Sequence, residues 1–130
     1  MKYLKKYESF DSNLILDIKD ILIELEDLDF NIEYTRNTDN LDKLAGSIPI
    51  MNIFIRKNNN DFFYMDENVK YTLKRLANYL NIDLYGYFSD GKPATKFYIY
   101  RDNRDIRTQT IKMDEKWPRI HSLRIIIPEY

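Results

Sequence analysis

Apolar residues recur every three or four positions between residues 12 and 28, which predicts an amphipathic helix. The other side of this segment is acidic, so we expect it to face water. Asp11 or Ser12 is expected to cap the first backbone amides, because a short side-chain oxygen reaches them. The apolar side is formed by Leu14, Ile18, Ile21, Leu22, Leu25 and Leu28.

A second amphipathic helix is predicted over residues 66–80, where Asp66 stands at the position of an N-cap. Each predicted helix has a single apolar stripe, so each needs another layer to cover that stripe. The stripe of the second helix consists of Val69, Leu73, Leu76 and Leu80.

Strand patterns fill much of the remaining chain. Residues 30–34 alternate between apolar and polar, which is the period of a half-buried strand. Residues 50–56 are rich in β-branched and aromatic side chains and predict a second strand, with Pro49 at its first position. The polar segment 35–47 is predicted to be a long connection between the two strands.

Residues 82–88 and 95–101 predict a hairpin, because Asp90 and Gly91 supply the positive φ that a tight turn needs. Two more strand patterns follow in the C-terminal part of the chain. They are residues 106–113, which alternate weakly, and residues 120–127, which Pro128 ends.

The predicted order of elements is α-β-β-α-β-β-β-β. Short turns between most strands favour antiparallel pairing, and two one-sided helices favour the same face of the sheet. The sequence therefore predicts an α+β fold, a two-layer sandwich with a mainly antiparallel sheet and two helices on one face. We expect a lead-in or recognition peptide at residues 1–10 and a single α+β domain at residues 11–130.

Charge is unevenly distributed, although the net charge is only −1. Residues 11–29 carry seven acids and one lysine, whereas residues 92–124 carry nine bases and four acids. Such asymmetry favours self-association or a basic surface for nucleic acid, or it reflects only solvated charges on different elements.

The absence of cysteine excludes disulfides and thiolate metal sites. Apolar runs are shorter than the ~20 residues of a membrane span, and the basic start lacks the apolar stretch of a secretory signal. We therefore expect a soluble protein of the cytosol, or of a particle assembled there, without a membrane partner.

Few residues offer catalytic chemistry. His121 is the only histidine and lies within a strand pattern, so we expect it to be structural rather than a catalytic base. Acids in two loops lack the spacing of a calcium-binding loop and are expected to be solvated. We predict no catalytic residue, metal or cofactor and no enzymatic activity, although two-carboxylate hydrolysis stays open because only geometry can pair the 21 acids.

Aromatic residues make up 15% of the chain, and two of them, Tyr98 and Tyr100, share one face of the predicted strand 95–101. Tyrosines between cations suit base stacking and phosphate binding, and they also suit sheet packing or a protein interface. The candidate nucleic-acid-binding residues are Lys96, Tyr98, Tyr100, Arg101, Arg104 and Arg107.

The opening MKYLKKYESF resembles the start of many small tailed-bacteriophage proteins, which begin Met-Lys, add further lysines and end the stretch with Glu-Ser-Phe. Several of them continue with a helix like IKDILIELED, here residues 18–27, and an aromatic-led strand. The resemblance covers about the first 34 residues. The matching positions are Met1, Lys2, Lys5, Glu8, Ser9 and Phe10.

The same opening is also similar to the N-terminal capsid-targeting tags of internal head proteins in some large tailed phages. Those tags are cut after a glutamate that has an apolar residue two positions before it. Glu8 departs from that rule, because Lys6 stands at this position, whereas Glu24 fits it but lies inside the first predicted helix. Packaging without cleavage is therefore what this similarity implies.

These resemblances imply a non-enzymatic phage accessory protein that acts through protein–protein contacts, as a virion-associated structural or head-cargo protein. Its partners would be phage virion components, and its location the virion or the infected host cytoplasm. The alternatives are a single-stranded nucleic-acid-binding module and a soluble inhibitor of a host defence protein. The predicted partner-binding residues are Tyr3, Leu4, Tyr7 and Phe10.

Overall fold

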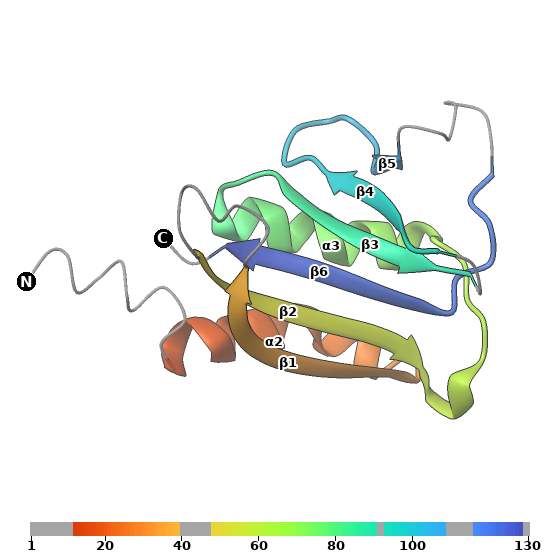
Figure 1. The fold of residues 1–130 in the computed structure, drawn as a ribbon, viewed down its shortest axis with the longest axis horizontal. Coiled ribbons are helices and arrows are strands. Elements are labelled where there is room, and N and C mark those ends of the chain that lie inside the picture. The colour runs from red at the N-terminus through yellow and green to blue at the C-terminus, as the bar shows by residue number, and fades with distance from the viewer. Residues whose placement is uncertain (1–11, 40–47, 91–92, 109–115, 129–130) are drawn as a thin grey trace, which may run out of the picture.

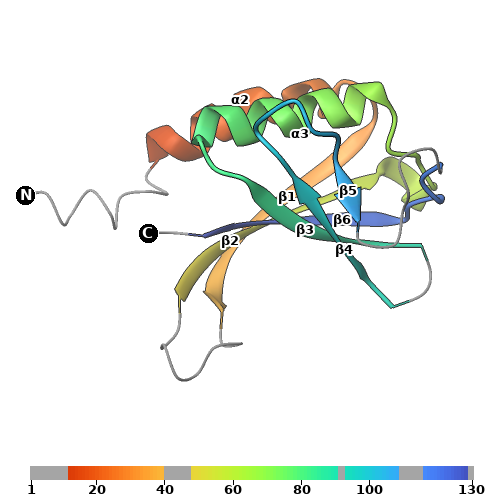
Figure 2. The same ribbon diagram turned by 90° about the horizontal axis from the view of Figure 1, so that it is seen from above.

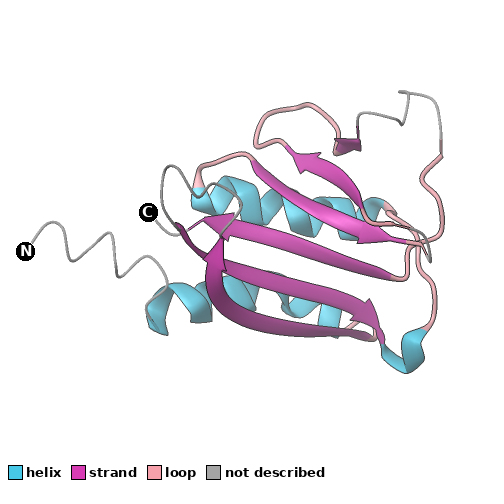
Figure 3. Ribbon diagram, viewed as in Figure 1, coloured by secondary structure: helices cyan, strands magenta, loops and turns pink. Residues whose placement is uncertain are grey.

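The chain folds into an antiparallel sheet with helices packed on one of its faces (Figures 1 and 2). The computed structural model describes residues 12–39, 48–90, 93–108 and 116–128. Over these ranges the elements follow the predicted order, so the α+β prediction is confirmed (Figure 3). The elements are α2 (Ser12–Glu26), β1 (Phe30–Asp39), β2 (Ile48–Lys57), η1 (Asn58–Asn60), α3 (Glu67–Leu80), β3 (Leu84–Ser89), β4 (Thr95–Ile99), β5 (Arg107–Thr108) and β6 (Ser122–Pro128).

The strands lie in the order β1-β2-β6-β3-β4-β5, and each neighbouring pair is antiparallel. The last strand, β6, therefore lies in the middle of the sheet, between β2 and β3 (Figure 1). Its β-branched sequence suits that place, because Ile125 and Ile127 are buried in the core. Figure 2 shows α2 and α3 on the same side of the sheet.

Helix α2 packs its predicted apolar stripe on the sheet, with Ile18, Leu22 and Leu25 fully buried. The prediction is wrong for Leu28, whose side chain is 42% exposed. The helix ends at Glu26, and the chain then turns through Asp29 in the left-handed region, with φ 69°. Leu28 therefore lies in the turn rather than on the helix stripe. The predicted cap at Asp11 or Ser12 lies outside the side chains that the structure describes.

Helix α3 begins and ends as its sequence indicates. The side chain of Asp66 accepts a hydrogen bond from the backbone N–H of Val69 at 3.0 Å, which confirms the predicted N-cap. The helix stops at Asn81, which adopts the left-handed conformation at φ 58° that asparagine tolerates better than most residues. Neither α2 nor α3, the helices of the described ranges, has the length and apolar character of a membrane span.

Strands β1 and β2 pair over their full ten residues. The predicted connection over residues 35–47 is therefore wrong at its start, since β1 continues to Asp39 and β2 begins at Ile48. The polar end of β1 is tolerated because this strand lies at the edge of the sheet, where one side can face water. Pro49 is the second residue of β2 rather than its first.

Strands β3 and β4 form the predicted hairpin. The expected positive φ in their turn involves Gly91, which lies outside the described residues. Strand β5 covers two residues of the predicted strand 106–113. Residues 109–113 of that prediction lie outside the described residues. Strand β6 begins at Ser122 instead of Ile120, because Ile120 forms a separate bridge with Phe63.

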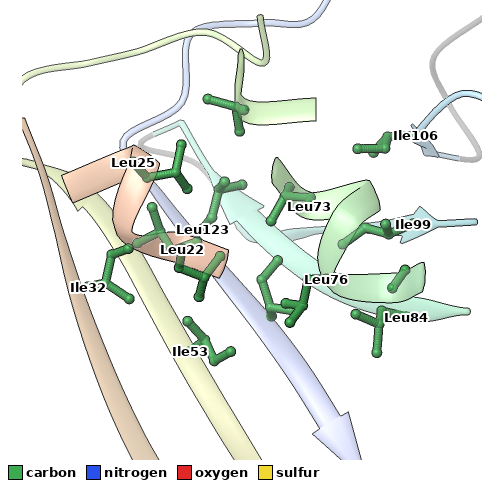
Figure 4. Packing of buried hydrophobic residues seen from close by; sticks show 14 of the residues in the cluster. Leu22, Leu25, Ile32, Ile53, Leu73, Leu76, Leu84, Ile99, Ile106 and Leu123 are labelled. Atoms are coloured by element: carbon green, nitrogen blue, oxygen red, sulfur yellow. The ribbon is translucent and has the colours of Figure 1, made fainter. Parts of the chain in front are cut away.

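The core lies between the two layers and joins both helices to the sheet, including Ile32 of the edge strand β1 (Figure 4). Leu22 from α2 and Leu76 from α3 are fully buried and point toward the sheet residues Ile53 and Leu123. Fully burying one such side chain stabilises the fold by about 1.5–3 kcal/mol relative to leaving it exposed. This packing occupies the helix-facing side of the strands and leaves their other side for another role.

Candidate functional site

The sheet has a face that no described helix covers, and Figure 1 looks onto it, with α2 and α3 behind the strands. We call it the helix-free face. Residues paired across an antiparallel ladder point to the same face, so the register places side chains in rows. In one row Tyr87 lies between Arg124 of β6 and Lys96 of β4. In the next row Tyr85 lies between Ile126 and Tyr98.

Aromatic rings gather on the β3 and β4 part of the helix-free face. The rings of Tyr85 and Tyr87 meet edge to face, with their centroids 6.3 Å apart. Those of Tyr98 and Tyr100 are nearly parallel, with their centroids also 6.3 Å apart and an interplanar angle of 19°. All four side chains are half-buried, so part of each ring stays accessible.

Cations lie over these rings. The ammonium of Lys96 is 4.6 Å from the ring centroid of Tyr85 and 5.4 Å from that of Tyr98. The guanidinium carbon of Arg124 is 5.1 Å from the ring centroid of Tyr87. Distances within about 6 Å give cation–π attraction of about 0.5–1 kcal/mol at exposed sites. The rings therefore fix the positions of positive charges on this face.

The cations of the helix-free face have no anionic partner in the described part of the chain. The side chains of Arg56, Lys96, Arg107 and Arg124 make no hydrogen bond or ion pair there. Among the described strand residues whose side chains point to this face, Glu33 is the acidic one. Four cations on strands β2, β6, β4 and β5 thus share this face with one described acid, which makes its electrostatic potential positive.

Cations elsewhere on the protein are engaged differently. On the helical side, Arg75 of α3 forms an ion pair with Glu24 of α2 at 2.7 Å. The ammonium of Lys57 donates a hydrogen bond to the backbone oxygen of Leu28 at 2.7 Å. Both cations are thus engaged by an oxygen atom, whereas Lys19 of α2 has, among the described residues, only a cation–π contact, 5.2 Å from the ring centroid of Tyr34.

The predicted nucleic-acid-binding residues divide into two groups. Lys96, Tyr98 and Arg107 lie on the helix-free face, and Tyr100 stacks beside Tyr98. Arg101 lies apart from them, because the strand ends at Ile99. Its guanidinium donates hydrogen bonds to the backbone oxygen of Asn81 at 2.7 Å and to the side-chain oxygen of Asn81 at 2.8 Å.

The guanidinium of Arg104 contacts both an aromatic ring and a carboxylate. Its guanidinium lies 4.0 Å from the ring centroid of Tyr100, and it also forms an ion pair with Asp102 at 2.9 Å. Hydrogen bonds from the side chain and the backbone N–H of Arg104 hold the pKa of Asp102 below its ordinary value of 3.8. Asp102 is therefore ionised at neutral pH and neutralises Arg104.

Sequence reasoning missed Tyr85, Tyr87 and Arg124, and it missed Phe54 of β2, which pairs with Arg124. The signal for Tyr85 and Tyr87 is their alternation in the predicted strand 82–88. Nothing in the sequence indicates that β6 lies beside both β2 and β3, so the neighbours of Arg124 emerge only from the fold. The predicted contact residues Tyr3, Leu4, Tyr7 and Phe10 lie outside the described residues.

A hollow of about 410 Å³ opens at the β3–β4 end of the helix-free face. Arg124 is one of the residues that border it, and the Nε atom of Arg124 is buried without a hydrogen-bond partner among the described residues. The hollow is lined by Phe54, Tyr87, Phe88, Ser89, Ala94, Ser122 and Arg124.

His121 lies next to the hollow without being in its lining. Its backbone N–H donates a hydrogen bond to the oxygen of Ser89 at 2.6 Å, and its ring meets that of Phe62 edge-on, with centroids 5.7 Å apart. In the ranges that the structure describes, no three histidine or acidic side chains come together as metal ligands would.

No protein-family model matches the sequence, and neither a curated protein nor a solved structure matches the chain. The arrangement of the helix-free face is therefore the basis for a functional proposal.

Proposed function

We propose that the protein is a non-enzymatic binding protein whose helix-free face binds single-stranded nucleic acid. The observation that supports this is a set of four cations that have no anionic partner among the described residues, on a sheet face that also carries stacked tyrosines. These cations are Arg56, Lys96, Arg107 and Arg124. Proteins that bind single strands combine these two elements, because cations hold the backbone phosphates while aromatic rings stack against bases.

The slightly acidic net charge does not oppose this proposal, because the charges are separated in space. The acids of α2 lie on the opposite side of the molecule from the helix-free face (Figure 2). Over distances longer than the ~8–10 Å Debye length at physiological salt, those acids are screened from a strand on the sheet. The exposed acids of α2 are Asp17, Asp20, Glu24 and Glu26.

The stacking part of the proposal is tested by removing one ring and keeping its bulk. We expect Tyr98→Leu to weaken binding of a labelled strand of about twelve nucleotides, measured by fluorescence anisotropy. One lost base–aromatic stack costs about 1–3 kcal/mol, or about 5- to 150-fold in affinity.

The matched control is Tyr71→Leu. Tyr71 is an exposed tyrosine of α3 that also has an arginine over its ring, with the Arg75 guanidinium 5.7 Å from its centroid. We expect the control to bind as the wild type does. Equal affinities of the two variants would contradict the proposal, and so would binding of poly-glutamate but not of the strand, which would indicate an acidic protein partner instead.

A second proposal concerns protein contacts through the helical layer. Apolar and aromatic side chains are exposed there among acids, which suits a partner with basic and apolar residues. Such contacts would suit a phage accessory protein in the virion, the role that the resemblance of residues 1–10 implies. Mass spectrometry of purified virions tests it, and absence of the protein from the particles would contradict it. The exposed side chains are Leu16, Ile23, Tyr71 and Tyr79.

A further inference from the structure

The hollow on the helix-free face has the size and walls of a small-ligand site. Its volume of about 410 Å³ falls within the ~300–1,000 Å³ of typical ligand pockets and equals roughly 14 water molecules at ~30 Å³ each. A lone phosphate would leave most of it unfilled. Phe54 and Tyr87 contribute aromatic walls, and Ser122 adds a hydroxyl.

Arg124 gives the hollow its charge. It lies between Phe54 and Tyr87 in the row that crosses β2, β6 and β3, so both of its cross-strand neighbours are aromatic. None of the described residues that line the hollow is acidic. The Nε atom of Arg124 is buried without a hydrogen-bond partner among the described residues, so no protein acceptor engages this guanidinium. An anionic ligand in the hollow would give Arg124 the charge partner that no described side chain supplies.

We infer that the hollow binds one nucleotide of the strand, with its phosphate on Arg124 and its base against Phe54 or Tyr87. This inference rests on the proposed single-strand binding and specifies the part of the ligand that enters the hollow. A planar ring joined to an anion matches aromatic walls joined to a guanidinium, and arginine binds phosphate oxygens with two parallel hydrogen bonds.

The hollow is continuous with the rest of the proposed interface. Lys96 follows Tyr87 in the same row, one strand further along the sheet. Neighbouring strands are ~4.8 Å apart, so this row spans roughly 14 Å from Phe54 to Lys96 across three strand spacings. A strand that places one nucleotide in the hollow therefore meets further cations and rings on the same face.

Adenosine 5′-monophosphate tests the inference, with adenosine as the probe that lacks the anion. We expect the monophosphate to shift the NMR signals of Phe54, Tyr87 and Arg124 and to compete with the labelled strand. We expect adenosine to bind at least about tenfold more weakly, because charge-assisted hydrogen bonds contribute about 1.5–3 kcal/mol each.

Two variants of the hollow and one control locate the effect. Arg124→Gln removes the charge, and Ala94→Glu adds a carboxylate at the exposed rim of the hollow without entering the core. We expect both to lose at least about tenfold in affinity for the monophosphate, by the same reasoning. Arg75→Gln makes the same charge change in the helical layer, and we expect it to bind as the wild type does. Normal binding by Ala94→Glu would overturn the inference even if Arg124→Gln failed to fold.

The outcomes separate the inference from the proposal on which it rests. Strand binding that the monophosphate does not displace would overturn the nucleotide site and leave single-strand binding intact. Monophosphate binding without strand binding would overturn the single-strand proposal. Equal affinity for adenosine and its monophosphate would overturn the role of Arg124 as the phosphate ligand.

Discussion

Adding a single methyl group at Gly86 should lower the stability of the fold. Gly86 lies in β3 between the site residues Tyr85 and Tyr87, with Ile125 of β6 and Phe97 of β4 as its partners. A Cβ atom at this position would lie 2.3 Å from the backbone oxygen of Arg124 and 3.1 Å from two ring carbons of Phe97. Gly86→Ala therefore forces strands β3 and β6 apart.

The magnitude follows from these contacts. Relieving the clash with a backbone oxygen requires a shift of about 1 Å in a central ladder, which weakens its hydrogen bonds at ~1 kcal/mol each. Moving the Phe97 ring off its rotamer adds about 0.5–1.5 kcal/mol. Reduced freedom of the unfolded chain offsets about 0.4–1 kcal/mol. We expect Gly86→Ala to lower the free energy of unfolding by about 2–3 kcal/mol, the upper part of the usual range of about 1–3 kcal/mol for overpacking.

Thermal unfolding followed by circular dichroism measures this loss. For a chain of this length we expect the Tm to fall by roughly 10 °C, because 1 kcal/mol corresponds to about 3–5 °C. Thr35→Ala, at an exposed position of the edge strand β1, is the control and should cost under about 1 kcal/mol. A Gly86→Ala protein whose Tm equals that of the control would refute the close approach of β3 and β6.

Two further predictions concern the start of helix α3 and the edge strand β1. Asp66→Ala should lower the free energy of unfolding by about 0.5–2 kcal/mol in urea titrations, because it removes the acceptor of the Val69 N–H. Asp66→Asn keeps an oxygen acceptor and should retain most of the wild-type stability. Equal losses in the two variants would contradict the cap. Burial, and then the charge of Glu26, raises the pKa of Tyr34 above its ordinary value of 10.0. The neutral phenol is thus the form that the fold favours, so its contribution is fully present below pH 10 and is lost as the pH rises above 10. Between about pH 9 and pH 11, the free energy of unfolding of Tyr34→Phe should fall less than that of the wild type. Urea titrations at several pH values measure this, and parallel pH dependences of the two proteins would refute the burial of the hydroxyl.

The fold could be predicted largely from local patterns. The three-and-four spacing of apolar residues marks α2 and α3, and Asp66 marks the start of α3. The predicted strand boundaries were wrong where pairing between distant segments decides them. The polar end of β1 is an example, because it is a strand only through its pairing with β2. Helix α2 ends before Leu28, and the chain turns through Asp29 in the left-handed conformation. Glycine is the usual sequence signal for such a residue, and position 29 has none.

The candidate site was less predictable. Alternation within one strand places Tyr98 and Tyr100 together, because both lie on the same strand pattern. The position of Arg124 beside Tyr87 depends on the insertion of β6 between β2 and β3, and no local pattern encodes that neighbourhood. Arg101 has the right residue type, but it lies beyond the end of β4 and is bound to Asn81.

The salt dependence of single-strand binding shows whether the cations of the helix-free face contact phosphates. If the four cations of the helix-free face each contact a phosphate, log affinity should fall with log salt at a slope of about −2.8, from the ~0.7 released counterions per contact. Affinity for the labelled strand should then drop about 50-fold between about 50 and 200 mM salt. No binding at about 50 mM salt, or an affinity that does not change with salt, would contradict the account.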